Sequence, residues 1–292
     1  MPSTPPPTQD AAAPSPAPSP DPSPELFHIS LNPSRPTTLV LLHGLLSCHL
    51  EWSLLIPHLS PYHLLVVDLP GHSGSAHITP YTIPSMSDAV ARLIRAHAHS
   101  AKAHVVGLSM GGFVTMDLAR RYPQLCQSAF ATGAAPFEGL FAFMAGYPSV
   151  VYGFMWLMVQ MPEGVYWWLA SKSTGYRRYE ELKVEMGRNL RWEVVREVYT
   201  SILGGLGWDE VRATTGVRVL NVAGGRQDDV QATRKIGECW REEGVTERMG
   251  SRAVVVRGAV HAWNLQMPEL FAEGITAWVE GKELPAEFEA LV

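Results

Sequence analysis

Cysteine is scarce in this sequence and widely scattered. The 292 residues contain three, Cys48, Cys126 and Cys239, and no two of them form a CxxC pair. An odd, sparse set of cysteines argues against a disulfide framework and is typical of a reducing compartment. We therefore expect three small buried thiols without a redox role.

Charge is also scarce and forms no block of one sign. Only 17% of the residues are charged, the formal net charge is -5, and no run of five basic residues occurs. The sequence therefore gives no indication of nucleic-acid binding. The apolar fraction of 46% is ample for a large core, and the nine tryptophans favour much buried or ligand-facing apolar surface.

The N-terminal segment lacks the features of a secretory signal. Residues 1–24 are nearly all Pro, Ser, Ala and Thr, with neither a basic stretch nor an apolar core. We expect a disordered, polyproline-like tail over residues 1–24, followed by one domain over residues 25–292. The expected location is cytoplasmic.

Continuous apolar runs recur along the rest of the chain and alternate with helix-like segments. Runs without period-two alternation are typical of strands buried on both faces of a parallel sheet. Five such runs lie at residues 37–44, 63–71, 103–112, 217–225 and 251–259, and a further strand is expected near Ala129. The pattern predicts an α/β fold with a doubly wound, mostly parallel sheet. In the helix predicted within residues 86–100, we expect Ser87 and Asp88 to form the N-cap.

The alternation stops between residues 136 and 208, which are rich in Met, Trp, Tyr and Phe. An insertion there would lie at the carboxyl ends of the strands, so we predict a helical cap over the ligand crevice. Gly139 to Pro162 contain no charged residue and are long enough to span a bilayer. Pro148, three glycines and the later strands that must rejoin the sheet favour a cap lining an apolar pocket, with peripheral membrane contact as the alternative.

The segment GLSMG, Gly107 to Gly111, has the pattern G-x-S-x-G. Chance matches to this pattern are common, but here it directly follows a predicted buried strand and precedes a predicted helix. A sharp turn in that context lifts the Ser109 hydroxyl above the sheet and places it at a helix N-terminus. We predict that Ser109 is a nucleophile.

A serine nucleophile needs a base and an orienting carboxylate. His261 follows the last apolar run, at the same sheet edge as Ser109, and Asp228 and Asp229 follow the run before it. An isolated histidine is more often structural, so His261 becomes a candidate base only together with Ser109. Either aspartate is a candidate acid.

Two backbone donors are needed for an oxyanion hole. The N–H of Met110, the residue after the nucleophile, is one candidate, and the N–H of Leu45 in the HGLL segment is the other. We interpret His43 in that segment as a structural residue that orients the loop.

These motifs together resemble the α/β-hydrolase superfamily. LLHGLLSCHLEW (Leu41 to Trp52) is similar to its oxyanion loop, and VVDLPGHSGS (Val66 to Ser75) to its D-x-P-G-x-G-x-S turn, with Ser73 where glycine is more usual. VGLSMGG is similar to its nucleophile elbow, and GAVHAWNLQMPELF to its histidine loop. The resemblance implies the order Ser, Asp, His and a G-x-x-D acid loop, which favours Asp228 over Asp229.

One departure concerns the N-terminal edge of the sheet. The family usually begins with a β-hairpin, but only ELFHISL is available here, so we expect an abbreviated edge.

The resulting hypothesis is a serine hydrolase that cleaves an ester or thioester of an apolar small molecule, with catalytic Ser109, His261 and Asp228. Neither a metal nor a cofactor is needed for this chemistry. The alternatives are a C–C bond hydrolase or lyase on the same triad, a ligand receptor with low turnover, and a membrane-associated lipase. The fold does not decide among them.

Overall fold

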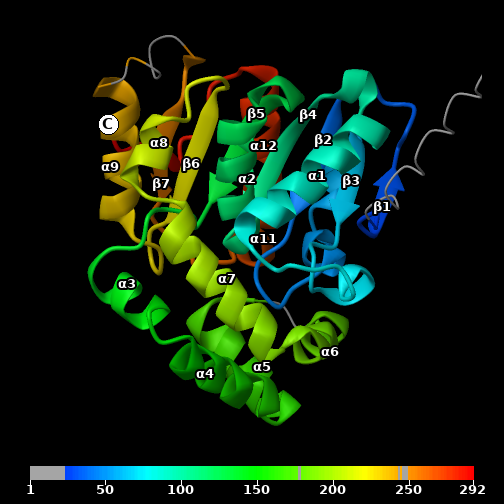
Figure 1. The fold of residues 1–292 in the computed structure, drawn as a ribbon, viewed down its shortest axis with the longest axis vertical. Helices are drawn as coiled ribbons and strands as arrows, with labels where there is room; N and C mark the ends of the chain where they lie inside the picture. The colour runs from blue at the N-terminus through cyan, green and yellow to red at the C-terminus, as the bar shows by residue number, and fades with distance from the viewer. Residues whose placement is uncertain (1–23, 177–178, 243, 245–248) are drawn as a thin grey trace, which may run out of the picture.

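The computed structural model describes residues 24–176, 179–242, 244 and 249–292 (Figure 1). Its sheet is built from β1 (His28–Leu31), β2 (Thr38–Leu42), β3 (His63–Val67), β4 (Ala103–Leu108), β5 (Cys126–Thr132), β6 (Val219–Gly224), β7 (Arg252–Val256) and β8 (Phe288–Ala290). The predicted tail, apart from Pro24, lies outside the described residues.

The strands have the order β1-β3-β2-β4-β5-β6-β7-β8. The inner strands β2 to β7 are parallel, whereas the edge strands β1 and β8 run antiparallel to their neighbours. Every residue of β2, β3, β4 and β6 is buried, as their unbroken apolar runs require. The predicted fold class is confirmed.

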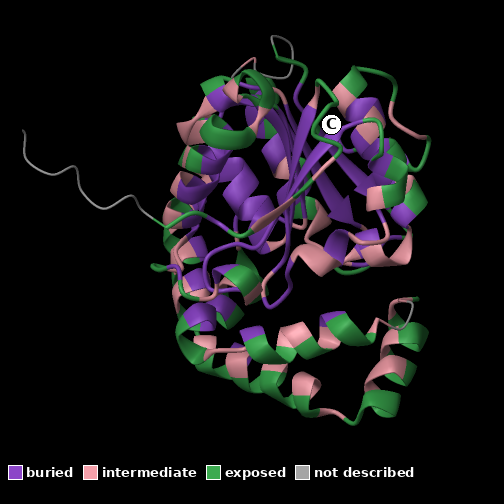
Figure 2. Cartoon of the chain, turned by 90° about the vertical axis from the view of Figure 1, so that its right-hand side faces the viewer, coloured by how far each residue is buried: buried purple, intermediate pink, exposed green. Residues whose placement is uncertain are grey.

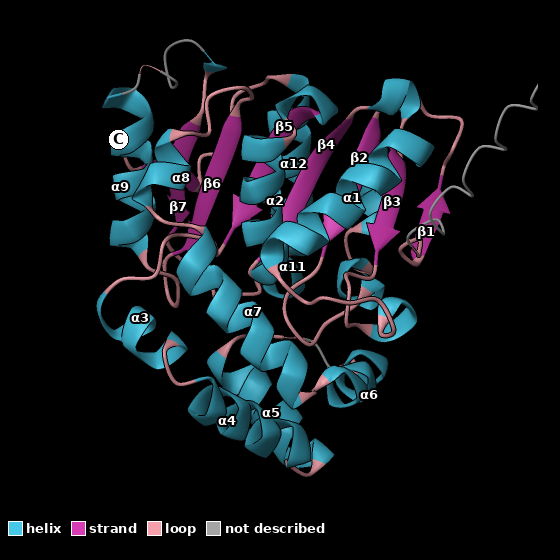
Figure 3. Ribbon diagram, in the orientation of Figure 1, coloured by secondary structure: helices cyan, strands magenta, loops and turns pink. Residues whose placement is uncertain are grey.

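Helices cover both faces of the sheet (Figure 3). One face packs against α1 (Ile83–His97), α2 (Met110–Arg121) and α9 (Val230–Glu242), and the opposite face packs against α12 (Pro268–Glu280). The remaining short helices of this domain are η1 (His49–Trp52), η2 (Ile56–Leu59), η3 (Ser73–Ser75), η4 (His99–Ala101), η5 (Pro123–Leu125) and α11 (Trp263–Gln266). The three cysteines are free and buried, as expected.

The predicted N-cap of α1 is wrong. The helix begins at Ile83, and its cap is Thr82, whose hydroxyl accepts a hydrogen bond from Ser85 N–H. Pro84 fits in the first turn because an N–H there would have no intrahelical acceptor. Ser87 is buried inside the helix, and Asp88 accepts a hydrogen bond from Tyr122 Oη.

Between β5 and β6 the chain forms a run of helices, most of which lie beyond one end of the sheet, at the bottom of Figures 1 and 2, whereas the last of them packs against α9. They are α3 (Gly139–Ala145), α4 (Pro148–Gln160), α5 (Glu163–Ser173), α6 (Glu180–Asn189), α7 (Trp192–Gly205) and α8 (Trp208–Arg212). Helix α7 connects this run of helices to the helices on the face of the sheet, because it packs against α3 and α4 as well as against α1. We refer to α3–α7 as the cap.

The uncharged segment from Gly139 to Pro162 is divided between two helices. Among the described residues, no single helix is long and apolar enough to cross a membrane. Helices α3 and α4 together pass that test by length and composition, but they are bent by 86° at the break between them.

Candidate active site

Ser109 lies in a strained turn between β4 and α2. Its backbone has φ 55° and ψ −118°, a conformation that residues with a Cβ rarely adopt. The turn is fixed by hydrogen bonds from Ser109 N–H to Thr132 O and from Gly111 N–H to His43 O. Strand β5 and the loop after β2 therefore hold the strained turn in place. The turn directs the Ser109 hydroxyl toward a pocket.

The two glycines of the motif are required by close backbone contacts. A Cβ at Gly107 would lie 2.1 Å from Gly111 O, and one at Gly111 would lie 2.1 Å from Leu42 O. Neither position can therefore carry a side chain while the turn keeps its shape.

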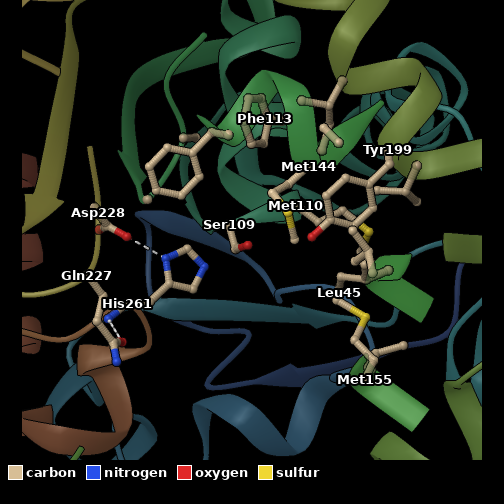
Figure 4. Close-up of a pocket in the computed structure, with 18 of the residues that line it drawn as sticks. Leu45, Ser109, Met110, Phe113, Met144, Met155, Tyr199, Gln227, Asp228 and His261 are labelled. Carbon is tan, nitrogen blue, oxygen red and sulfur yellow. Dashed lines mark hydrogen bonds and ion pairs between the residues drawn. The ribbon is translucent and has the colours of Figure 1, made fainter. Parts of the chain in front are cut away.

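The structure brings His261 and Asp228 together beside Ser109 (Figure 4). His261 Nδ1 donates to Asp228 Oδ1 over 2.5 Å, and Asp228 Oδ2 accepts from Gly224 N–H over 2.6 Å. This arrangement leaves Nε2 of the imidazole for the substrate side. No hydrogen bond joins Ser109 Oγ to the imidazole in the described part of the chain; such bonds often tighten only when substrate binds.

Asp229, the alternative acid, makes hydrogen bonds to the first turn of α9 and not to His261. Its carboxylate Oδ1 accepts a hydrogen bond from Ala232 N–H, and its carbonyl accepts from Thr233 N–H. Asp229 therefore caps the N-terminus of α9, where a negative charge is favourable.

Two residues that were not predicted as part of the site position His261. Gln227 Oε1 accepts a hydrogen bond from His261 N–H over 2.8 Å and so fixes the backbone of the histidine loop. Gly133, at φ 62°, leaves room for the ring, because a Cβ there would lie 2.7 Å from His261 Cε1. Neither residue belongs to a recognisable sequence motif, because both contact His261 only once the chain is folded.

The charge state of His261 is set by opposing effects. Partial burial lowers the pKa of His261, but the hydrogen bond and charge of Asp228 outweigh it, and the pKa lies above 6.5. Asp228 therefore favours the imidazolium, the form that a general base becomes when it takes a proton.

The loop after β2 carries the predicted oxyanion donor Leu45. Gly44 N–H donates to Glu51 Oε2, and Leu46 N–H donates to His72 Nε2. The N–H of Leu45 between them takes part in no hydrogen bond among the described residues. Met110 N–H is likewise the first in α2 and lacks an intrahelical acceptor. Both residues line the pocket beside Ser109.

His43 is a structural residue, as its position in the sequence suggested. Its Nδ1 donates to Gly44 O and its Nε2 accepts from Leu69 N–H, so both ring nitrogens are engaged within the protein. Burial lowers the pKa of His43, which suits this neutral form.

Asn189, at the end of α6, connects the cap to the oxyanion loop. Its buried side-chain amide donates to Leu46 O and Ser47 O, and its Oδ1 accepts from Ser73 N–H. Leu46 itself has φ 67°, so these bonds hold a left-handed non-glycine residue next to Leu45.

Glu51 is a buried carboxyl group close to the site. Its side chain accepts from Gly44 N–H over 2.8 Å, and the charge of His261 favours its ionised form. Burial nevertheless raises the pKa of Glu51 from 4.5 to about 7. The native state therefore binds this proton more tightly than the unfolded chain does, which stabilises the fold. This stabilisation is fully present below pH 4.5 and is lost as the pH rises through about 7.

A Glu51→Gln variant should consequently gain stability relative to the wild type as the pH rises. Glutamine retains an acceptor for Gly44 N–H but carries no charge to desolvate. The gain between pH 5 and pH 8.5 should be on the order of 3 kcal/mol at most. Urea denaturation at both pH values measures it, with Glu273→Gln on the exposed side of α12 as the control. A difference between wild type and Glu51→Gln that does not vary with pH would contradict the assignment.

The pocket above Ser109 has a volume of about 540 Å³. Its polar end holds Ser109, Asp228 and His261, while the cap and the start of α2 supply the opposite wall. The cap side of the pocket is mostly apolar, with Tyr166, Lys183 and Tyr199 as its polar side chains. The apolar lining includes Phe113, Phe137, Phe141, Met144, Phe154, Met155, Met158, Val159, Met186 and Ile202. The arrangement places the Ser109 hydroxyl, the predicted nucleophile, at one end of a mostly apolar cavity.

Two groups of side chains elsewhere have metal-ligating atoms close together. Among the described residues they are Glu25, His28 and His97 near β1, and Cys48, His49 and Asp68, of which the first two belong to the loop after β2. In the second group burial raises the pKa of the Cys48 thiol to about 12, which disfavours the thiolate that metals bind. Neither group lines the pocket as far as the chain is described.

Comparison with known proteins agrees with the fold. A family model described as alpha/beta hydrolase fold matches residues 37–160. An "AB hydrolase superfamily protein" of Gibberella zeae is 29% identical over 272 residues, which cover 91% of this chain and 88% of that protein. The solved structure of MenH from S. aureus superposes with a TM-score of 0.68 at 16% identity, covering 88% of this chain and 98% of that one.

A shorter match concerns an esterase. The pimeloyl-[acyl-carrier protein] methyl ester esterase of Aeromonas hydrophila is 33% identical over 101 residues, 34% of this chain and 38% of the esterase. Its name is consistent with a hydrolase that acts on ester bonds. The sheet, the elbow and these likenesses together show that the chain has an α/β-hydrolase fold and resembles members of that superfamily over most of its length.

Proposed function

We propose that the protein is a serine hydrolase that cleaves an ester or thioester of an apolar small molecule through an acyl-enzyme. The observation that carries this proposal is the His261–Asp228 pair beside Ser109 at the polar end of a mostly apolar cavity. A serine hydroxyl needs such a base to become a nucleophile, and a largely apolar wall selects an apolar substituent on the carbonyl.

In the proposed mechanism, His261 Nε2 takes the proton of Ser109 Oγ as the oxygen attacks the carbonyl carbon. The Leu45 and Met110 N–H groups stabilise the negative charge that develops on the carbonyl oxygen, and Asp228 stabilises the imidazolium. His261 then protonates the leaving alcohol or thiol. It next removes a proton from the water that attacks the acyl-enzyme, and finally returns that proton to Ser109.

The chain-length dependence of turnover tests this proposal. With p-nitrophenyl esters of rising acyl length, kcat/KM should increase by up to about fourfold per added methylene until the cavity is filled. Met158→Trp, which fills part of the cavity, should move the maximum to shorter chains. The neighbouring Leu157→Trp on α4 is the control because Leu157 is 55% exposed and does not line the cavity.

Two outcomes would contradict the proposal. A kcat/KM that is independent of acyl length would show that the cavity does not hold the acyl chain. Tight binding of the longer esters without turnover would instead favour a receptor.

A further inference from the structure

The helices of the cap are apolar on two faces. On α4, Val151, Met155 and Met158 share the face that lines the pocket, as their spacing of four and seven residues requires. Val150 and Leu157, also seven residues apart, are 55% exposed on another face. A surface helix usually has one apolar stripe toward the core and a polar opposite face, so this second apolar face needs an explanation.

Helices α3 and α5 repeat the pattern. On α3, Leu140 and Phe143 are exposed, whereas Ala145 lines the pocket. On α5, Val165 and Trp168 are exposed, whereas Tyr166 between them lines the pocket. Twelve of the seventeen exposed large apolar side chains of the described residues lie between Leu140 and Leu169. We define the outer apolar face of the cap by six of them: Leu140, Phe143, Val150, Leu157, Val165 and Trp168.

The outer apolar face is continuous with the substrate pocket. Phe141, Met144 and Phe154 line the pocket, yet they are 47%, 40% and 62% exposed. These three residues therefore form an apolar rim that joins the cavity to the outer face. The exposed cap helices are seen at the bottom of Figure 2.

The lack of charged residues limits what can cover this face. Gly139 to Pro162 contain no Asp, Glu, Lys or Arg, and the whole chain has a formal net charge of -5. Specific protein interfaces typically carry about ten hydrogen bonds and a polar rim, which this segment is poorly equipped to supply. Attraction to an anionic surface is also disfavoured by the net charge. What remains is insertion of apolar and aromatic side chains into the boundary of a zwitterionic bilayer.

We propose that the cap docks on a phospholipid bilayer through the outer apolar face, and that apolar esters pass from the bilayer over the rim to Ser109. A second copy of the chain seated on this face would cover the rim, whereas a bilayer covers the face and delivers the substrate. The delivery step rests on the proposed function, but the docking step does not require catalysis.

Flotation with phosphatidylcholine vesicles tests the docking step. The full-length Ser109→Ala protein should float with the vesicles equally well in 0.1 M and 0.5 M salt, because insertion of apolar groups is not screened. The double variant Leu157→Ser/Trp168→Ser should reduce the partition coefficient at least about tenfold. Leu203→Ser is the matched control, because Leu203 is 42% exposed on α7 but lies outside this face. With Ser109 restored, all variants should hydrolyse p-nitrophenyl acetate like the parent, which shows that they fold.

Three results would overturn the docking step. They are absence of vesicle binding by the parent protein, an equal loss of binding in Leu203→Ser, and self-association in ultracentrifugation that the double variant abolishes in place of vesicle binding. The docking and the proposed function fail separately. Vesicle binding without hydrolysis of any ester refutes the function, while hydrolysis of soluble esters without vesicle binding refutes the docking.

Discussion

Replacing Ser109 by alanine should lower ester hydrolysis by roughly 10⁴- to 10⁶-fold, the range found when a serine nucleophile is removed from a triad. Alanine leaves the backbone strain at φ 55° in place and removes only the hydroxyl. The base His261 would then have no proton to accept from a nucleophile. The rate with a p-nitrophenyl ester and labelling by a fluorophosphonate probe measure the loss.

The control for this variant is Ser60→Ala, because Ser60 is exposed and does not line the pocket. It should label and turn over like the wild type. Labelling that persists in Ser109→Ala would place the reactive nucleophile elsewhere in the chain.

The second large effect is expected at Asp228. Asp228→Asn removes the negative charge that orients and stabilises the His261 imidazolium, and kcat should fall on the order of 10⁴-fold. The pH profile should change in a defined direction as well. Since a general base acts only when neutral, activity is lost as the pH falls through the pKa of His261, which Asp228 raises. The acidic limb of kcat/KM should therefore move to lower pH in Asp228→Asn.

Asp229→Asn is the matched control, one residue along the chain. Asparagine is as good an N-cap as aspartate, so α9 keeps its capping bond to Ala232 N–H and kcat should change little. Equal losses in the two variants would show that neither aspartate alone orients His261.

These two aspartates also show how far the sequence could be interpreted. An acid after the strand now seen as β6 was predictable because buried parallel strands deliver their carboxyl ends to one edge. The choice between Asp228 and Asp229 rested on family resemblance, since it depends on whether α9 begins one residue earlier or later. Helix boundaries are the feature that local sequence determines least well, as the misplaced cap of α1 also shows.

Other parts of the site were invisible for a different reason. Glu51 and Asn189 act through hydrogen bonds to backbone atoms, and for Asn189 those atoms lie more than 110 residues away in the chain. Strand β8 has only three residues, and its place is set by pairing with β7 rather than by an apolar run. By contrast the sharp turn at Ser109 was predictable, because the close contacts that require Gly107 and Gly111 fall within five consecutive residues.

The hydrogen bonds of Asn189 have a consequence for motion. Because α6 holds the backbone of Leu46 and Ser47, lifting that end of the cap would release a left-handed residue beside the oxyanion donor. If the cap opened at this end in each catalytic cycle, the predicted oxyanion donor Leu45 would lose its position each time. We therefore expect the α6 end of the cap to stay in place if the cap opens, and any movement to be larger at α3 and α4.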